Sequence, residues 1–466
     1  MEFNFQLQVV ALFVALVLLY SPWRVPSGAL PILGHLHLLG RQMTIHRTLG
    51  AIADKYGPAF MLQLDINRTL VVSSWEMMKD CFSTNDRAFA TQPFNATGKH
   101  LGYDHAMMGK IATIELLSKT RLEKLKHVRI NEIDEGIKEL YSLWSKNDKG
   151  THVEKEMKQW FQHLSFNIKT KIIAGKRYFG DVNAEHKVEV QRFKKEITKL
   201  VHLAGVFVLS DALPYLKWLD LGGYLGAMKS VANELDSLIG NWLEEHRSKA
   251  QSGKKEGEVD FIDVMLSIIH VHDKDLKYSH DRDTISKATI WALIAAGSET
   301  TSLSLTWALF LLLNNSHILK KAQHELDSHV GRDRHETLRL YPAAPIALPH
   351  EAMEDSQAGG YHVPKGTQLL ANIWKLQRDP RRFLTTHANV DVRGQQFEFI
   401  PFGLGVQSCP GVTFAMQVLH LTLARLIHGF NLETPSNGPI DMSEGLALTL
   451  PKKKPCGSPA HPTPSM

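Results

Sequence analysis

The stretch Phe399 to Gly429, FIPFGLGVQSCPGVTFAMQVLHLTLARLIHG, holds the residues that decide the fold. Cys409 lies in a loop of small residues, and apolar residues recur at three- and four-residue steps from Val412 onward, a spacing that predicts a helix. The free N–H groups and the positive dipole end of a helix N-terminus favour a thiolate over a thiol. Because glycines carry no side chain, a large flat ligand could approach this loop closely.

The loop around Cys409 has three interpretations on this pattern alone. A loop thiolate under a planar cofactor suits haem-thiolate chemistry, because anionic sulfur pushes electron density onto iron and favours O–O cleavage. Burial as a small hydrophobic residue is the commoner fate of a free cysteine. A dinucleotide-binding loop at Gly403 and Gly405 is disfavoured, because the third glycine is missing and no strand–helix–strand unit accompanies the loop.

The composition bounds the class of protein. The chain has 466 residues, of which 44% are hydrophobic, and no Gly/Ser-rich or Pro-rich linker divides its middle, so we expect a single large body. Three cysteines make no disulfide framework, which fits a reducing compartment. The formal charge of +5 permits contact with an anionic membrane surface. No basic stripe with interleaved aromatic residues is present, and we therefore expect no nucleic-acid partner.

The N-terminal segment predicts a membrane anchor. Residues Phe3 to Tyr20 are uncharged, and the run is apolar without a break from Val9, which is near the short limit for a bilayer-spanning helix. A cleaved signal peptide is the alternative, but Glu2 is the only charge before the segment and no small-residue cleavage site follows it. Basic residues begin at Arg24, so the positive-inside rule places the body in the cytosol.

We therefore expect four parts along the chain. These are a transmembrane signal anchor over 1–21, a proline-rich hinge over 22–40, a main domain over 41–451 and a disordered tail over 452–466. The main domain is predicted to be mainly α with small β-sheets. Strand pairs are expected at Phe60 to Leu64 with Thr69 to Ser73, and at Tyr361 to Thr367 with Leu369 to Trp374.

Two further motifs carry polar residues on predicted helices. The longest helix is expected over Thr284 to Asn314, where Glu299 and Thr300 interrupt an apolar run. Acid and hydroxyl groups in a buried helix need a reason, which is either a kink or a functional site. Glu336 and Arg339 lie three residues apart, a spacing that suits an ion pair on one helix face; such pairs are most often weak surface bridges.

Residues Phe402 to Gly411 resemble the cysteine-loop signature of the cytochrome P-450 superfamily, Phe-x-x-Gly-x-Arg-x-Cys-x-Gly. The match covers Phe402, Gly405, Cys409 and Gly411, while Gln407 stands where the family has arginine. The run Ala-Gly-Ser-Glu-Thr at 296–300 is similar to the family's Ala-Gly-x-(Asp/Glu)-Thr groove.

The resemblance implies a fold, a cofactor and roles for individual residues. It implies the cytochrome P-450 fold with an N-terminal membrane anchor, and haem b (iron protoporphyrin IX) whose iron has Cys409 as its axial ligand. Glu299 would relay protons and Thr300 would hydrogen-bond bound dioxygen, as catalytic residues. The Glu336–Arg339 pair would be a structural core pair. The implied cofactor-binding residues are Cys409, Phe402, Gly405, Gly411 and His350, the last at a place where plant members bind a haem propionate.

Segments at 174–180, 383–387 and 391–396 resemble family 82 of the plant cytochromes P-450. This similarity implies a single-pass enzyme of the endoplasmic reticulum membrane, surrounded by lipid at its anchor, with a cytosolic catalytic body. Such an enzyme takes electrons from NADPH through a separate cytochrome reductase. It inserts one oxygen atom from O2 into a small hydrophobic secondary metabolite: an alkaloid, flavonoid, coumarin or terpenoid.

Several departures from the family pattern favour a protein that binds haem weakly and has little or no activity. A Trp and an Arg that the family places shortly before Lys110 are absent, Gln407 replaces the loop arginine, and segments near 331–335 and before Pro380 are short. A buried propionate without a cationic partner is costly, so weak haem retention is expected. The alternative is therefore a catalytically impaired or inactive relic, a non-catalytic membrane-anchored protein. An unrelated membrane-tethered hydrolase is disfavoured, because no nucleophile elbow is present.

Overall fold

The computed structural model divides the chain into two compact units. The first comprises Met1–Pro93 and Ile346–Gln407, and the second Phe94–Pro345 and Ser408–Met466. The structure describes residues 24–30, 33–39, 44–64, 67–103, 112–146, 153–180, 187–204, 208, 220, 222–252, 259–271, 281–324, 336–378, 396–434, 438–445, 449–453 and 457–462. The sequence predicted one main domain over 41–451, and both units contain residues from that range. The chain passes between the units within ordinary segments, so no linker composition marks the boundary.

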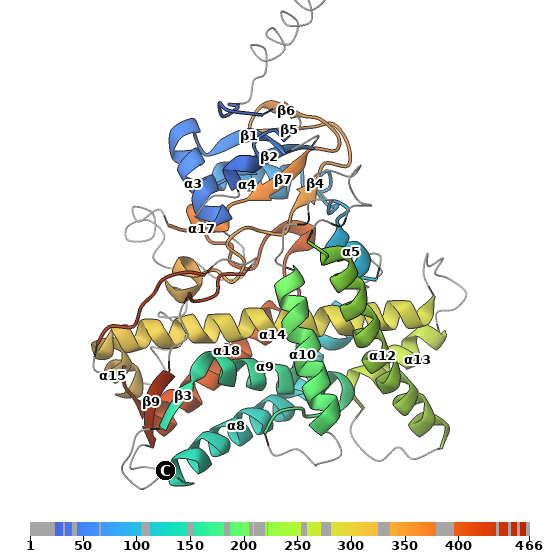
Figure 1. Ribbon diagram of the computed structural model, residues 1–466, viewed down its shortest axis with the longest axis vertical. Helices are drawn as coiled ribbons and strands as arrows, with labels where there is room; N and C mark the ends of the chain where they lie inside the picture. The colour runs from blue at the N-terminus through green and yellow to red at the C-terminus, as the bar shows by residue number, and fades with distance from the viewer. Residues whose placement is uncertain are drawn as a thin grey trace, which may run out of the picture. The chain divides into compact units, whose positions relative to one another are not determined.

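The first unit is built on a four-stranded sheet in the order β1-β2-β7-β4 (Figure 1). Strands β1 (Ala59–Leu64) and β2 (Asn67–Val72) form the predicted pair, and they run antiparallel. Strand β2 pairs parallel with β7 (Gln368–Ala371), and β7 pairs antiparallel with β4 (His350–Glu351). The helices of this unit are α2 (Leu36–Leu39), α3 (Ile45–Tyr56), α4 (Trp75–Lys79) with a π-helical turn at Asp80–Thr84, and α17 (Ile373–Leu376).

The predicted hairpin over 361–374 is wrong. Strand β6 (Tyr361–Val363) pairs with β5 (Ser356–Ala358) in a separate two-stranded sheet, whereas β7 joins β2 and β4. A turn at Gly366, where φ is +78°, separates β6 from β7, and the Gly366 N–H donates to the Ala352 carbonyl. Apolar alternation shows which face of a strand is buried but not which strand is its partner.

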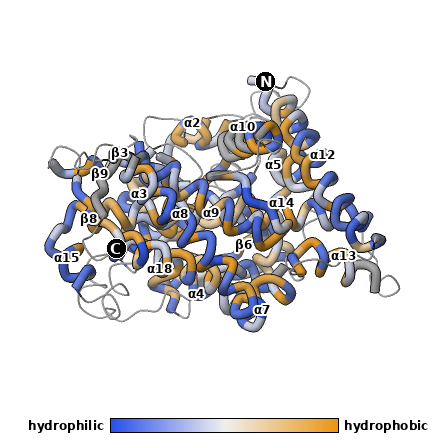
Figure 2. The backbone as a smooth tube through the Cα atoms, turned by 90° about the horizontal axis from the view of Figure 1, so that it is seen from below, coloured by the Kyte–Doolittle hydropathy of each residue, from blue (hydrophilic) through white to orange (hydrophobic). Residues whose placement is uncertain are grey.

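The second unit is mainly helical. Its longest helix is α14 (Arg282–Asn314), close to the predicted range, and α9 (Met157–Ala174) and α18 (Val412–Gly429) pack against it (Figure 1). The other helical elements are α5 (Ala96–His100), a π-helical turn at Ala112–Leu116, α7 (Lys119–Lys124), α8 (Lys126–Lys146), α10 (Lys187–Ala204), α12 (Tyr224–Gln251), α13 (Phe261–Val271) and α15 (Ser316–His324). Polar and apolar residues alternate along α12 (Figure 2), whose buried face includes Leu235, Leu238 and Trp242.

Two features fix α14 at its ends. Asp281 caps the N-terminus, where its carboxylate accepts hydrogen bonds from the Thr284 N–H at 2.9 Å and the Thr284 hydroxyl at 2.6 Å. Near the C-terminus the Trp307 indole N–H donates to the Leu450 carbonyl at 2.7 Å. The helix is thus tied to a segment that lies 143 residues later in the chain.

The ends of the chain differ from expectation in one respect. Residues 1–21, the predicted anchor, lie outside the described residues, and among the helices that are described none is long and apolar enough to cross a membrane. The predicted disordered tail includes strand β9 (Gly457–Pro462), which pairs with β3 (Val153–Glu156) and β8 (Phe430–Leu432). The prolines and lysines suggested disorder, but these two strands each supply backbone partners for the tail.

Part of the predicted hinge is docked on the first unit. His35 is buried, its Nε2 lies 2.8 Å from the Pro26 carbonyl oxygen, and its Nδ1 accepts from the Gln63 N–H of β1 at 3.0 Å. Because a backbone N–H donates to Nδ1, the proton of the neutral ring is on Nε2. One buried imidazole therefore joins the proline-rich segment to the sheet.

Candidate active site

Cys409 lies just before the first turn of α18, as the sequence predicted. It is a free cysteine with an exposed surface, and Gly411 is the N-cap residue of the helix. The side chain is exposed, but the protein packed around it partly desolvates the thiol and raises its pKa; the Gly411 N–H lowers the pKa by a smaller amount. The helix N-terminus therefore acts in the predicted direction, but burial outweighs it. A coordinated metal ion would supply the charge that removes the proton.

Two glycines of the signature have different structural reasons. Gly405 has φ of +66°, and a Cβ atom there would lie 2.1 Å from the Asp86 carboxylate, so the protein itself requires glycine. Gly411 has an ordinary φ of −87°, and a Cβ atom would lie 3.7 Å from the Cys409 sulfur, which is normal contact. The half-buried Phe402 lies in the same unit as Gly405.

Gln407, which replaces the expected arginine, is held inside the first unit. Its side-chain amide donates to the Ala90 carbonyl, and its amide oxygen accepts from the Gln92 side chain at 3.1 Å. Sequence reasoning missed both partners, because they are more than 300 residues away. The neutral amide is thus bound by protein groups on both its donor and acceptor sides.

His350 is buried in β4 of the first unit. Its Nδ1 lies 2.7 Å from the Phe89 carbonyl oxygen, and its ring meets the edge of Phe82 at 4.8 Å. Burial lowers the pKa of His350, and the Phe89 carbonyl and Asp86 oppose this shift. A neutral ring that donates from Nδ1 to a carbonyl retains Nε2 as an acceptor.

Glu299 and Thr300 lie in the middle of α14, where the helix surface opens. Ala296 is exposed, whereas most residues from Thr301 to Leu313 are buried. The Thr300 hydroxyl donates to the Ala296 carbonyl at 2.7 Å, one turn earlier, which is the usual way a helix accommodates threonine. The Glu299 carboxylate accepts a hydrogen bond from the Gln162 side chain of α9 at 3.1 Å.

A buried lysine lies beside this section of α14. Lys169 of α9 is 5% exposed, its ammonium donates to the Ser165 carbonyl at 3.2 Å, and it lies 5.6 Å from the centre of the Phe414 ring in α18. Burial lowers the pKa of Lys169 to about 7. Sequence reasoning missed it, although its position on the buried face of α9, near Phe166 and Ile172, was a usable signal.

The site residues predicted from sequence fall in both units. Cys409, Gly411, Glu299 and Thr300 belong to the second unit, in which α14 and α18 pack against each other. Phe402, Gly405 and His350 belong to the first.

Comparison with known proteins identifies the family. The family model described as Cytochrome P450 matches residues 25–456. The chain belongs to the cytochrome P450 family. It is 48% identical to the xanthotoxin 5-hydroxylase CYP82C4 of Arabidopsis thaliana, over 92% of this chain and 91% of that protein. It is 45% identical to the strychnine-10-hydroxylase of Strychnos nux-vomica, over 92% and 89%, and 43% identical to the flavonoid-6-hydroxylase of Mentha piperita, over 98% and 97%.

A solved structure confirms the fold. A zebra fish cytochrome P450 with progesterone superposes with a TM-score of 0.73 at 21% identity, over 91% of this chain and all of that one. The predicted mainly helical P450 fold and the resemblance to plant family 82 are therefore confirmed. P450 enzymes are haem-thiolate proteins, so haem b is the cofactor of this family.

The donor set of this P450 fits haem. Within the described residues, the one cluster of side chains that could share a metal ion does not include Cys409, so the cysteine is not part of a multi-ligand site such as zinc requires. A single accessible thiol is what haem would need from the protein, because the porphyrin itself supplies most of the ligands of the iron. Cys409 would hold the iron, and the exposed α14 surface at Ala296 and Thr300 leaves small side chains for a flat group to meet.

The predicted Glu336–Arg339 pair forms, but it is not deeply buried. The Arg339 Nε donates to one carboxylate oxygen at 2.8 Å and Nη2 donates to the other at 2.5 Å, which is a bidentate ion pair. The Glu336 side chain is 51% exposed while that of Arg339 is 14% exposed. The ion pair predicted from the spacing is present, but Arg339 is half-buried and Glu336 is exposed, so the pair does not lie in the core.

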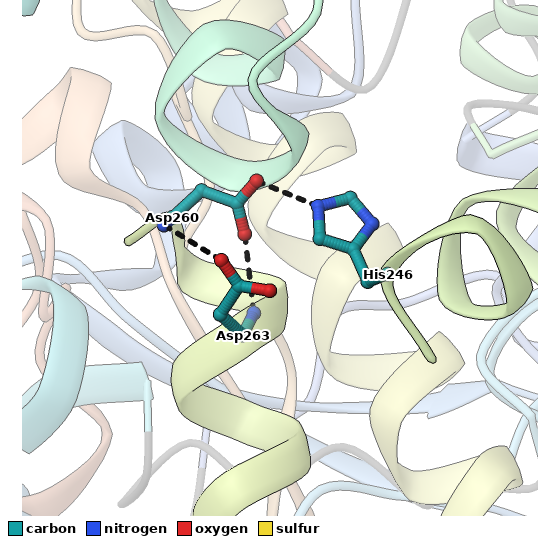
Figure 3. Close-up of side chains that lie close together, drawn as sticks. All are labelled: His246, Asp260 and Asp263. Atoms are coloured by element: carbon teal, nitrogen blue, oxygen red, sulfur yellow. Dashed lines mark hydrogen bonds and ion pairs between the residues drawn. The ribbon is translucent and has the colours of Figure 1, made fainter. Parts of the chain in front are cut away.

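The cluster outside the P450 site consists of His246, Asp260 and Asp263 (Figure 3). His246 of α12 has Nδ1 at 2.6 Å from the Trp242 carbonyl oxygen and Nε2 at 2.7 Å from the Asp260 carboxylate. Asp260 and Asp263 exchange backbone-to-carboxylate hydrogen bonds at the start of α13, which is a capping box. Since both ring nitrogens are engaged by protein, the cluster ties α12 to the start of α13 rather than offering a metal site.

Proposed function

We propose that this P450 is a monooxygenase that inserts one oxygen atom from O2 into a small hydrophobic plant secondary metabolite. The substrate is an alkaloid, flavonoid, coumarin or terpenoid. Support comes from relatives that hydroxylate xanthotoxin, strychnine and flavonoids at 43–48% identity. Family membership alone gives the reaction class, and these relatives narrow the substrate class.

One observation carries the proposal: an accessible Cys409 and the Glu299–Thr300 pair belong to the same compact unit. Haem bound through Cys409 would supply oxygen activation. The protein's own task is then proton delivery. Thr300 holds a hydroxyl at the open face of α14, and Glu299 holds a carboxylate one residue away, so these two side chains can hold and pass protons at the reacting oxygen.

We further propose the cellular setting from the sequence. The apolar segment before Tyr20 and the basic residues after it suit a single-pass protein of the endoplasmic reticulum membrane with its catalytic body in the cytosol. Electrons would come from NADPH through a separate cytochrome reductase. The formal charge of +5 favours contact with an anionic membrane surface or an acidic partner.

The test is reconstitution of the full chain with a plant NADPH-cytochrome reductase in lipid. Reduced protein should give the thiolate-type carbon-monoxide difference band, and one compound among xanthotoxin, strychnine and a flavone should gain one oxygen atom. Cys409→Ser should abolish the band, whereas Cys81→Ser, at the buried cysteine of the first unit, should keep it. A wild-type protein with the band but without product from any substrate class would contradict the proposal.

The second candidate function is a catalytically impaired or inactive relic. Gln407 favours it, because a neutral amide already bonded to Ala90 and Gln92 offers no positive charge to a propionate. Measuring haem per protein for wild type and Gln407→Arg separates the two candidates. A near-stoichiometric haem content in wild type, unchanged in the variant, would exclude the relic.

A further inference from the structure

Gln162 of α9 is the side chain that holds Glu299. Its amide Nε2 donates to Oε2 of Glu299 at 3.1 Å, across 137 residues of sequence. Within the part of the chain that the structure describes, no second hydrogen bond or ion pair to this carboxylate is found. The direction in which the Glu299 side chain lies is therefore tied to one residue on a neighbouring helix.

The surroundings of Gln162 give no structural reason for an amide at this position. Gln162 is half-buried, next to the buried residues Phe161, Leu164 and Ser165 of α9, and a polar group withdrawn from water is costly unless it is bonded. Asn167, another amide on this helix, instead bonds the backbone of Tyr178 and Phe179. The recorded partner of Gln162 is Glu299.

Helix geometry explains why Glu299 needs such a partner. Successive residues of an α-helix point about 100° apart, so the Glu299 side chain leaves α14 well to one side of Thr300. The open surface of the helix is at Ala296 and Thr300, one turn apart. The backbone alone therefore does not bring the carboxylate to the Thr300 hydroxyl.

We propose that Gln162 is a positioning residue that keeps the Glu299 carboxylate in a fixed place at the edge of the Thr300 face, from which it can exchange protons in the monooxygenase reaction. The inference rests on the proposed function, since it assigns a helper to the proposed proton carrier. Loss of the amide donor leaves a half-buried carboxylate without its bond. The Glu299 carboxylate should then spend less time at the position from which it delivers protons, so that reducing equivalents are lost as hydrogen peroxide.

The first experiment tests the contact without using activity. Gln162→Leu, Glu299→Gln and the double variant form a double-mutant cycle in chemical unfolding of the haem-loaded protein. The two changes should be non-additive, because they remove the two ends of one bond. Additive effects within experimental error would overturn the proposal.

The second experiment tests positioning in the reconstituted full chain, with whichever of xanthotoxin, strychnine and a flavone wild type oxidises. Product formed per NADPH consumed should fall about three- to tenfold in Gln162→Leu, as expected for loss of one hydrogen bond of ordinary strength. The KM should stay within about twofold, because the residue acts on proton delivery and not on substrate binding. Gln191→Leu, at an exposed glutamine of α10, is the matched control and should keep wild-type coupling.

Glu299→Gln, measured in the same assay, separates the positioning role of Gln162 from the proposed proton-carrier role of Glu299. If Glu299→Gln is uncoupled while Gln162→Leu matches wild type, Glu299 is catalytic and the positioning role is wrong. If Glu299→Gln itself matches wild type, or wild type forms no product, the proposed proton carrier fails and the positioning role falls with it. Gln162→Glu should be more uncoupled than Gln162→Leu, because a second carboxylate repels that of Glu299.

Discussion

Gly297 leaves room for the side chain of Lys169. A Cβ atom at Gly297 would lie 2.3 Å from Cε and 3.1 Å from Cδ of Lys169, so the lysine stem passes directly over the backbone of α14. The helices α9 and α14 approach closely at this point because one residue has no side chain. The glycine before Glu299 thus has a packing reason within the protein.

This contact predicts the effect of a single methyl group. Gly297→Ala should destabilise the folded protein by about 1–2 kcal/mol, because a buried lysine stem has little room to move. In the Lys169→Ala background, where the lysine stem is gone, Gly297→Ala should cost much less stability than it does in wild type. Chemical unfolding of the four proteins measures both quantities. Equal losses from Gly297→Ala in the two backgrounds would contradict the packing account.

Lys169 predicts a dependence of stability on pH. Its pKa is lowered by burial from 10.5 to about 7 in the folded state, so between these values the unfolded state binds more protons and stability rises with pH. Lys169→Met should be more stable than wild type at neutral pH and should lack this rise. Unfolding from about pH 7 to about pH 10 checks it. Lys171→Met, at an exposed lysine of the same helix, should keep the wild-type slope.

The glycines of the cysteine loop predict a contrast between folding and haem binding. Gly405→Ala should cost about 1–3 kcal/mol of stability even without haem, because of its positive φ and the nearby Asp86. Gly411→Ala should cost only about 0.5–1 kcal/mol in the haem-free protein, as for loss of a helix cap. If haem needs the space at Gly411, that variant should lose haem far more than stability. Unfolding and haem content, measured in parallel, decide this.

The His246–Asp260 pair predicts a second pH effect of opposite sign. Burial lowers the pKa of His246, but the hydrogen bond and charge of Asp260 outweigh it and the pKa is raised above 6.5. The stability from this pair is thus fully present below pH 6.5 and is lost as pH rises through the folded value. Asp260→Asn keeps a helix-capping side chain, so its deficit should be large near pH 6 and small near about pH 9. A deficit that does not change with pH would refute the account.

The sequence predicted elements that depend on local pattern and missed those that depend on distant partners. The α14 helix, the β1–β2 pair and the cysteine before α18 follow from apolar spacing and from a ten-residue signature. The partner of β6 and the strand at the end of the chain did not follow, because pairing depends on which backbone groups remain unbonded elsewhere.

The site shows the same division. Motifs placed Glu299, Thr300 and Cys409 on the correct elements, but Gln162 and Lys169 belong to no motif and act through packing between helices. The effect of the helix N-terminus on the pKa of Cys409 could be inferred from the sequence, whereas the burial that opposes it could not. A motif shows which chemical groups a site contains, but packing and burial by distant residues cannot be inferred from it.

The bond from Trp307 to the Leu450 carbonyl and the pairing of β3 with β9 have a consequence for how the protein is made. On the ribosome, Leu450 and β9 are synthesised well after Trp307 and β3, their respective partners. The second unit therefore cannot complete these contacts until synthesis has passed Pro462, and its nascent form exposes an unfinished interior. Shortening the chain by its last seventeen residues, Leu450 to Met466, would remove an internal support and not a dispensable end.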